Sequence, residues 1–552
     1  MQRAQAAAPA CPCVSGRGRP SSLHSRTGTV YPKSYPMSFS HLHALLKRRD
    51  IMEWPKKKAK LLNNSLHIAW NFIKNNCLKL FLLKRYRELM PQGIVFLAFL
   101  LIYIIIGYFP KTIKGFSFIA GDEPHYLVMT QSIANDGDFN LDNNYKLDLH
   151  KEFYNAYLDR HYINIHGKNY SIHSFGLPII MAPFYKLFGY KGVFLGMILF
   201  SCFGLVSVYN ICKSYSNPKS AFTATFFLGL TVPVGIYLSS QLFPETIAFT
   251  LFAYLISMVL RLDFKHLKSS FILILIISII LSLLHIKFTL LTFGAGLLSM
   301  KVSLKDKSIK HVFIFWSLIG IMTLLTTYLI LSITYDGHVL EALHRAALPG
   351  GNESGPSMTL KYVLRGVYLN FFEREKGIFW YMPVLLIFLN PLYIYSIFRY
   401  RLLNCKIQIL GVFISNVPYL IAVFSFFDSL GGWCPPGRYL IPSMVFVAVL
   451  LSLVIDVIPK WLLKISVFIT FICVLKPGIM YADPNNSFAV TRLYNAISDL
   501  IISEKMTNYA TTVDTLSKVK FIGLLVGSIF ATVSYEMITK TFTIISFKTN
   551  TN

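Results

Sequence analysis

Long runs of apolar residues dominate this chain and recur from residue 94 to residue 538. A helix needs about 20 mostly apolar residues to cross a bilayer, and these runs carry few charges. We count 12 candidate spans: 94–109, 191–211, 221–238, 246–260, 271–284, 288–300, 311–334, 377–398, 408–427, 439–458, 465–481 and 521–538. Prolines at 244, 383, 418 and 442 predict kinks or span ends. The pattern therefore predicts an all-α polytopic membrane protein with about 12 transmembrane helices.

The charged residues between the spans are strongly biased. If the N-terminal arm is cytoplasmic and the spans alternate, the cytoplasmic loops hold 16 Lys/Arg and two acids. The outer loops hold the two signs in nearly equal number. This bias follows the positive-inside rule. Both termini are then predicted to be cytoplasmic, residues 110–190 form a large extracytoplasmic first loop, and the net charge of +27 needs no nucleic acid to explain it.

Composition supports a chain surrounded by lipid and divides it into parts. Charged residues make up 14% of the chain, against roughly 25% in a soluble domain. Residues 1–36 are rich in Ala, Pro, Arg and Ser and contain no acid, which indicates a disordered or spurious N-terminal extension, with a transit peptide as the alternative. Residues 37–93 form a basic cytoplasmic arm, and 94–481 form the transmembrane core. Residues 482–552 form an outer loop and a last transmembrane helix.

The first outer loop opens with the sequence GDEPHY at 121–126. Pro124 suits the first turn of a helix that would run to about Asn135, and either carboxylate before it suits the helix cap. Adjacent carboxylates at the mouth of an apolar bundle could also take a proton from an attacking hydroxyl. A plain cap is the alternative. The apolar residues of this helix, such as Leu127 and Met129, are expected to lie on the membrane surface.

Further along the same loop, alternation around Gly167 predicts a short hairpin. His161, His166 and His173 lie on or beside this hairpin, but they lack regular ligand spacing, so we do not predict a zinc site. A helix at the membrane interface is predicted from 176 to 189.

Two other places put polar groups at an outer membrane boundary. His285 and Lys287 interrupt the apolar stretch 271–300, which predicts two short helices with an outward-facing tip. Arg438 follows a Gly- and Pro-rich turn and opens a span at its outer end. Its fork of donors suits phosphate oxygens, although anchoring to lipid headgroups is the alternative.

Together these motifs resemble the C-type membrane glycosyltransferases (GT-C), most of all the protein O-mannosyltransferases and the bacterial aminoarabinose transferases. The resemblance covers roughly residues 90–460. The residues that carry it are 121–126, the stretches 170–173 and 176–178, Pro244-Glu245, 376–383, and 431–433 with 437–440. The resemblance implies sugar transfer from a polyprenyl-phosphate donor to an acceptor outside the cytoplasm, with Asp122 as the catalytic carboxylate.

The function predicted is thus a membrane glycosyltransferase acting at the extracytoplasmic face. The predicted catalytic residues are Asp122 and Glu123, and the predicted donor-phosphate ligands are Arg438 and Lys287. Candidate substrate-binding residues are His125, Tyr126, His173, His285 and Glu245. No cofactor is predicted, and a divalent metal is an open alternative.

The predicted partners are the lipid-linked donor, the bilayer, and a glycan, lipid or protein acceptor, with no nucleic acid. The predicted location is the plasma (inner) membrane, or the endoplasmic reticulum in a eukaryote. The alternative functions are a transporter or flippase for lipid-linked glycans and a non-catalytic membrane subunit. A transporter would usually keep its polar residues at mid-membrane, whereas here they gather in the outer loops.

Overall fold

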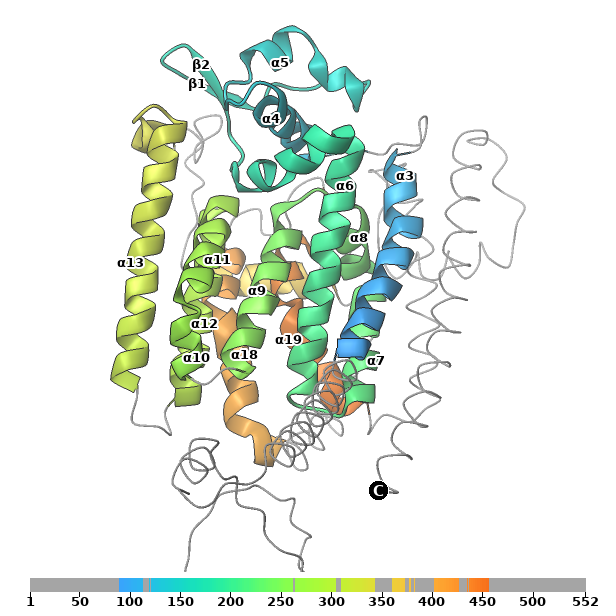
Figure 1. The fold of residues 1–552 in the computed structure, drawn as a ribbon, viewed down its shortest axis with the longest axis vertical. Helices are drawn as coiled ribbons and strands as arrows, with labels where there is room; N and C mark the ends of the chain where they lie inside the picture. The colour runs from blue at the N-terminus through green and yellow to red at the C-terminus, as the bar shows by residue number, and fades with distance from the viewer. Residues whose placement is uncertain are drawn as a thin grey trace, which may run out of the picture. The chain divides into compact units, whose positions relative to one another are not determined.

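The computed structural model describes residues 89–112, 119, 121–261, 264–303, 309–342, 360–372, 377–378, 382, 402–425, 434 and 436–455. Several predicted parts lie outside these residues: the extension 1–36, the basic arm as far as residue 88, most of the span 377–398, the span 465–481, and the C-terminal region 482–552 with the span 521–538. Within them the chain is helical apart from one two-stranded hairpin (Figure 1).

Four described helices are long and apolar enough to cross a membrane: Leu89–Tyr108, α6 (Gly176–Lys213), α9 (Pro244–Arg261) and α13 (Ile309–Thr334). The sharply bent pair α7 (Pro218–Leu230) and α8 (Val232–Ser240) could form a fifth span. Shorter apolar stretches of helix are α11 (Phe271–Leu284), α12 (Thr289–Ser303), α19 (Met444–Val454) and residues 410–425 of α18 (Leu402–Ser425). The other described elements before residue 121 and after residue 175 are η1 (Ile104–Tyr108), α3 (Phe109–Thr112), α10 (Phe264–Ser269), η3 (Ile286–Phe288), α15 (Leu360–Phe372) and η6 (Arg438–Ser443). These helices support a multi-pass membrane protein, and the total of 12 spans stays a prediction.

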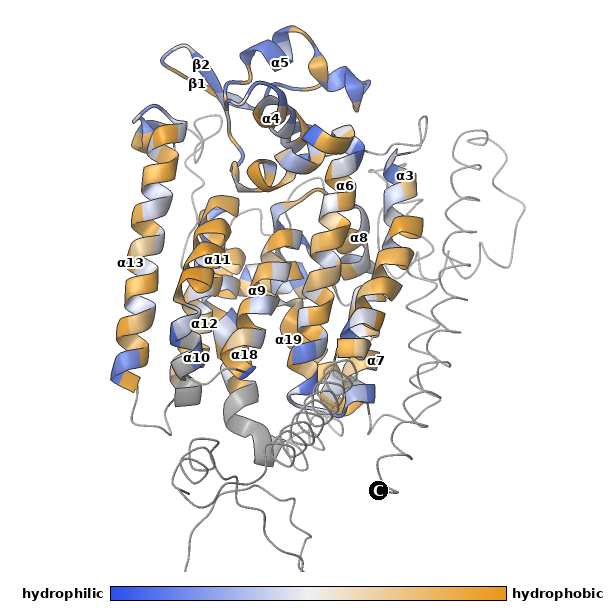
Figure 2. Cartoon of the chain, viewed as in Figure 1, coloured by the Kyte–Doolittle hydropathy of each residue, from blue (hydrophilic) through white to orange (hydrophobic). Residues whose placement is uncertain are grey.

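Burial separates the central helices from the outer ones. The apolar windows of α6 and α9 are 72% and 78% buried, whereas that of α13 is only 28% buried. The exposed side of α13 carries Phe313, Leu318, Leu325 and Leu329, and Figure 2 shows it as largely hydrophobic. A surface this apolar is stable against lipid rather than water.

Two helix pairs lie especially close in the bundle: α6 packs along α9, and α12 packs along α18. Gly294 of α12 faces the carbonyl oxygen of Ser415 on α18, so a side chain at this position would collide with backbone. Small residues at such crossings allow membrane helices to approach closely.

Residues 121–175 of the first predicted loop form a compact segment at one end of the helices, here called the outer segment after the predicted topology (Figure 1). It contains α4 (Glu123–Asn135), α5 (Asp142–Lys146), η2 (Leu149–Glu152) and the antiparallel strands β1 (Tyr162–Ile165) and β2 (Lys168–Ser171). Tyr162 pairs with Ser171 and Ile165 with Lys168, so the predicted hairpin is confirmed. The outer segment continues directly into α6, whose backbone is non-helical at Phe188 and Gly189. There the predicted interface helix meets the span.

One expectation about α4 is wrong. Leu127 and Met129 do not lie on a membrane surface, because both are buried within the protein. The reason is that α4 packs against α6, which covers its apolar residues.

Candidate functional site

Four charged residues from four separate elements meet at the base of the outer segment. Arg438, at the start of η6, donates from Nη1 to Oδ2 of Asp122 at 2.9 Å. Its Nε lies 3.4 Å from Oε2 of Glu245, in the first turn of α9. Lys287 of η3 donates to the other oxygen of Glu245 at 2.9 Å. The result is a row of alternating negative and positive side chains, in the order Asp122, Arg438, Glu245 and Lys287, here called the charged row.

Burial makes the charged row costly to keep. The Glu245 side chain is fully buried, those of Lys287 and Arg438 are each 9% exposed, and that of Asp122 is 29% exposed. Buried charges require partners, and within a membrane protein they usually mark function. Although Nε of Arg438 and Oε2 of Glu245 lie close together, neither makes a hydrogen bond. The charged row thus has unused hydrogen-bonding capacity, and Asp122 is its most accessible member.

Aromatic rings hold the two cations in place. The Arg438 guanidinium lies 4.1 Å from the ring centre of Phe243, and Lys287 Nζ lies 3.8 Å from that of Tyr439. Tyr419 donates a hydrogen bond to the Tyr439 carbonyl at 2.7 Å. Cation–π contacts of this kind favour a fixed cation in a dry site.

The Asp122 side chain is not used as a helix cap. Asp122 occupies the N-cap position of α4, but its carboxylate makes no capping hydrogen bond and instead accepts from Arg438. Burial alone would raise the pKa of this carboxyl, but the nearby Arg438 and His173 outweigh burial and lower it. Asp122 is therefore an ionised hydrogen-bond acceptor.

The structure does not bring Glu123 into the charged row. Its side chain is buried, accepts from Lys111 Nζ at 2.5 Å, and accepts from the backbone N–H of Leu242 at 2.9 Å. Glu123 thus ties α4 to α3 and to the segment before α9, which positions the neighbouring Asp122.

Three histidines (His125, His161 and His173, here the histidine trio) lie near Asp122. The rings of His125 and His161 stack at 3.8 Å, and the ring of His173 lies 5.1 Å from that of Tyr126. Burial and the neighbouring imidazoles lower the pKa of His125 to about 3. Burial also lowers the pKa of His173, to about 4, against the opposing effect of Asp122. Both rings are therefore neutral at pH 7 and can exchange hydrogen bonds with a bound substrate.

The remaining predicted residue, His285, supports the tip between α11 and α12. Its Nδ1 accepts from the Lys287 backbone N–H at 3.2 Å, which caps η3. Two contributors to this region were not among the predicted site residues. His161 was considered only with His166 and His173, as a zinc site that we did not predict, and Phe243 is one of many apolar residues in the chain, so neither carried a local signal for this site.

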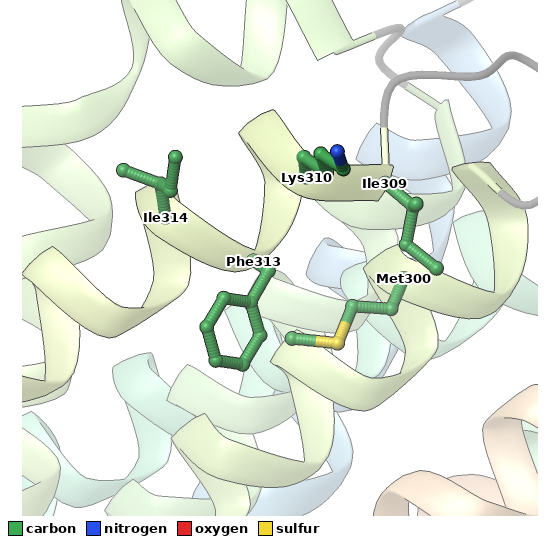
Figure 3. A pocket seen from close by; sticks show the side chains of 5 residues that line it. All are labelled: Met300, Ile309, Lys310, Phe313 and Ile314. Carbon is green, nitrogen blue, oxygen red and sulfur yellow. The ribbon is translucent and has the colours of Figure 1, made fainter.

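A shallow hollow elsewhere in the described part is unrelated to the charged row. It has a volume of about 390 Å³ and is lined by Met300 of α12 and by Ile309, Lys310, Phe313 and Ile314 of α13 (Figure 3). It lies at the start of α13, whose 26 residues span roughly 39 Å at about 1.5 Å each. The outer segment contacts the other end of α13.

Comparison with known proteins returns structural but not sequence matches. No family model matches the chain, and no curated protein matches it. Its fold is similar to the crystal structure of ArnT from Cupriavidus metallidurans bound to undecaprenyl phosphate, with 12% identity, a TM-score of 0.45, and coverage of 82% of this chain and 78% of that one. The apo structure of the same protein matches with 11% identity, a TM-score of 0.45, and coverage of 82% and 77%.

Proposed function

We propose that this chain is a membrane glycosyltransferase that moves a sugar from a polyprenyl-phosphate donor to an acceptor at the extracytoplasmic face. The observation that carries the proposal is the hydrogen bond between Asp122 and Arg438, which joins a candidate base to a candidate phosphate ligand. Both stand where the outer segment meets the ends of apolar helices. A lipid-linked donor would need such a place, with its tail in the bilayer and its phosphate at the boundary.

In the proposed reaction, a nucleophilic group of the acceptor attacks the anomeric carbon of the donor sugar. The bond between that carbon and the phosphate oxygen breaks, and the phosphate leaves with the electron pair. Asp122 accepts the proton lost by the acceptor. Arg438 and Lys287 stabilise the negative charge that develops on the phosphate, an effect that is strong in a dry site.

Arg438 would link donor binding to the activity of the base. In the structure its Nη1 donates to Asp122, and this ion pair lowers the pKa of the carboxyl and makes it a weak base. Phosphate oxygens would compete for the same guanidinium. The Arg438 guanidinium would then be shared between Asp122 and the phosphate. The pKa of Asp122 would therefore rise towards its ordinary value when the donor is in place.

Glu245 and Glu123 would act as positioning residues. Glu245 holds Arg438 and Lys287 on either side, and Glu123 fixes the start of α4 through Lys111 and Leu242. The histidine trio and Tyr126 lie near Asp122 and would contact the acceptor or the sugar.

The proposal is tested by measuring how the purified protein binds undecaprenyl phosphate and uses undecaprenyl-phosphate sugars. Arg438→Lys should raise the donor KM markedly, because a single ammonium cannot span Asp122, Glu245 and a phosphate as the guanidinium fork does. Lys287→Met should weaken binding less. Lys310→Met, in the hollow at the start of α13, is the matched control and should behave as wild type.

Donor saturation curves of Arg438→Lys that overlay wild type would assign Arg438 to membrane anchoring. The transporter and the non-catalytic subunit make different predictions. A non-catalytic subunit would keep its function in Asp122→Asn, and a transporter would move lipid-linked glycan across vesicles without forming a glycosylated product. Mass spectrometry of envelope glycans from cells with and without the protein would identify the transferred sugar.

A further inference from the structure

His166 does not belong with the histidine trio, although the sequence presents it between His161 and His173. It sits at the tip of the β1–β2 hairpin, where His166 and Gly167 both have positive φ, 48° and 84°. A two-residue turn with positive φ at both positions matches the right-handed twist of the flanking strands. In the structure this tip lies beside the outer end of α13 (Figure 1).

The chain after α13 brings two more ligand-type side chains to the same place. Asp336 and Gly337 have positive φ, and Gly337 N–H donates to Ser332 O at 2.7 Å, so the helix ends in a tight turn. This turn places His338 and Glu341 against the hairpin tip. The imidazoles of His166 and His338 stack with ring centres 4.0 Å apart.

The contact is held by interactions that do not involve the two histidines. Lys168 Nζ lies 2.6 Å from Oδ2 of Asp336, and the Tyr170 hydroxyl donates to the same oxygen at 3.0 Å. The rings of Tyr170 and Tyr335 meet edge to face at 5.2 Å. The hairpin is thus docked independently, so a ligand would find His166, His338 and Glu341 already assembled.

We propose that His166, His338 and Glu341 bind one zinc ion, which fastens the outer segment to the end of α13. Nε2 of His166 lies 3.6 Å from Oε2 of Glu341, and Nδ1 of His338 lies 4.0 Å from it. One ligand atom from each of the three residues lies within 4.8 Å of the others. A tetrahedral zinc site with bonds of about 2.0–2.1 Å needs ligand atoms roughly 3.3 Å apart, so small side-chain rotations would suffice.

The donor set favours zinc over other common ions. Two imidazole nitrogens and one carboxylate are a known zinc combination that leaves a fourth position for water. Magnesium and calcium prefer oxygen ligands throughout. The His166 side chain is 63% exposed and that of His338 is 42% exposed, so an ion can enter directly from solvent.

The site is peripheral to the charged row and does not depend on the proposed reaction. Its effect would be mechanical, because the loop that begins with Asp122 and α4 also contains the hairpin. A metal that links the hairpin to α13 would restrict the motion of that loop. It would also stabilise the folded protein, because the ion binds the folded state and not the unfolded chain.

The test uses the full-length protein in detergent, stripped of metal with a chelator and titrated with Zn²⁺ against a chromophoric competitor. His166→Gln and His338→Gln should each bind one zinc fewer than wild type, or bind it more weakly by over about tenfold, the loss expected even for an outer-shell partner. His311→Gln, an exposed histidine at the start of α13, is the matched control and should retain the ion.

A second measurement separates this site from adventitious binding elsewhere. Zn²⁺ should raise the thermal midpoint of wild type and of His311→Gln, and should not raise that of His166→Gln. The metal-free midpoints of all three should agree, since these side chains are exposed. Equal zinc stoichiometry and affinity in wild type and both site variants, or no binding by wild type, would overturn the proposal.

Discussion

Asp122 and Glu123 are adjacent in sequence but contact different partners. Substituting one or the other should therefore have different effects on turnover and on thermal stability. Asp122→Asn preserves shape while removing the proton acceptor, so it should reduce sugar transfer by about 10²–10⁴-fold. Its thermal midpoint should fall less than that of Glu123→Gln, because the buried Arg438 keeps Glu245 as a partner. Turnover by the purified variant and its melting curve are the measurements. Near-normal turnover would remove Asp122 from the mechanism.

Glu123→Gln should act chiefly on stability. The substitution leaves the buried Lys111 ammonium without its carboxylate, and breaking a buried pair costs about 3–5 kcal/mol. Its thermal midpoint should fall clearly, with a smaller loss of turnover per folded molecule than in Asp122→Asn. The double variant Glu123→Gln/Lys111→Met also removes the buried ammonium and should recover part of the midpoint. No recovery would show that the ion pair is not the cause.

The folded structure is expected to be acid-sensitive because of His125 and His173. The folded state holds the pKa of His125 at about 3 and that of His173 at about 4, below the usual value of about 6.5. As pH falls from about 6.5 to 4, the unfolded chain gains protons that the folded protein does not, so stability falls with pH across that window. Thermal midpoints should follow this trend, and His125→Gln should flatten it. An unchanged slope in that variant would exclude His125 as a source.

At the scale of elements, helix contacts depend on backbone approach that composition alone does not reveal. Gly294→Ala places a methyl group against the Ser415 carbonyl and should separate α12 from α18, giving a marked loss of thermal stability. Gly320→Ala on α13 is the matched control, because no atom lies within 4 Å of its added methyl. The control should be neutral or slightly stabilising, since alanine is the better helix former. Equal midpoints for the two variants would contradict the close crossing.

The whole molecule is predicted to place residues 110–190 outside the cytoplasm. Tyr157 is 84% exposed in the outer segment, and Lys310 is exposed at the opposite end of α13. In a background without native cysteines, a membrane-impermeant maleimide should label Tyr157→Cys in intact cells and label Lys310→Cys only after permeabilisation. The reverse pattern would invert the topology.

Local patterns in the sequence predicted several elements correctly because each depends on near neighbours. Apolar run length predicted α9, α11, α12 and α13, and alternation about Gly167 predicted the hairpin. Pro124 predicted the start of α4. The charge bias predicted that Asp122, Lys287 and Arg438 lie on the same side of the membrane. The structure places these three residues in one site.

Tertiary structure alone decided how those residues meet. Arg438 lies 316 positions from Asp122, and no local pattern determines which carboxylate such a distant cation will contact. The same holds for the separation of His166 from the histidine trio, which depends on where the hairpin docks. The opposite fates of Asp122 and Glu123 arise because successive side chains on one helix point in different directions and meet different neighbours. The sequence by itself determined which segments are apolar and which residues can carry charge; packing of distant segments decided which charges share one buried site.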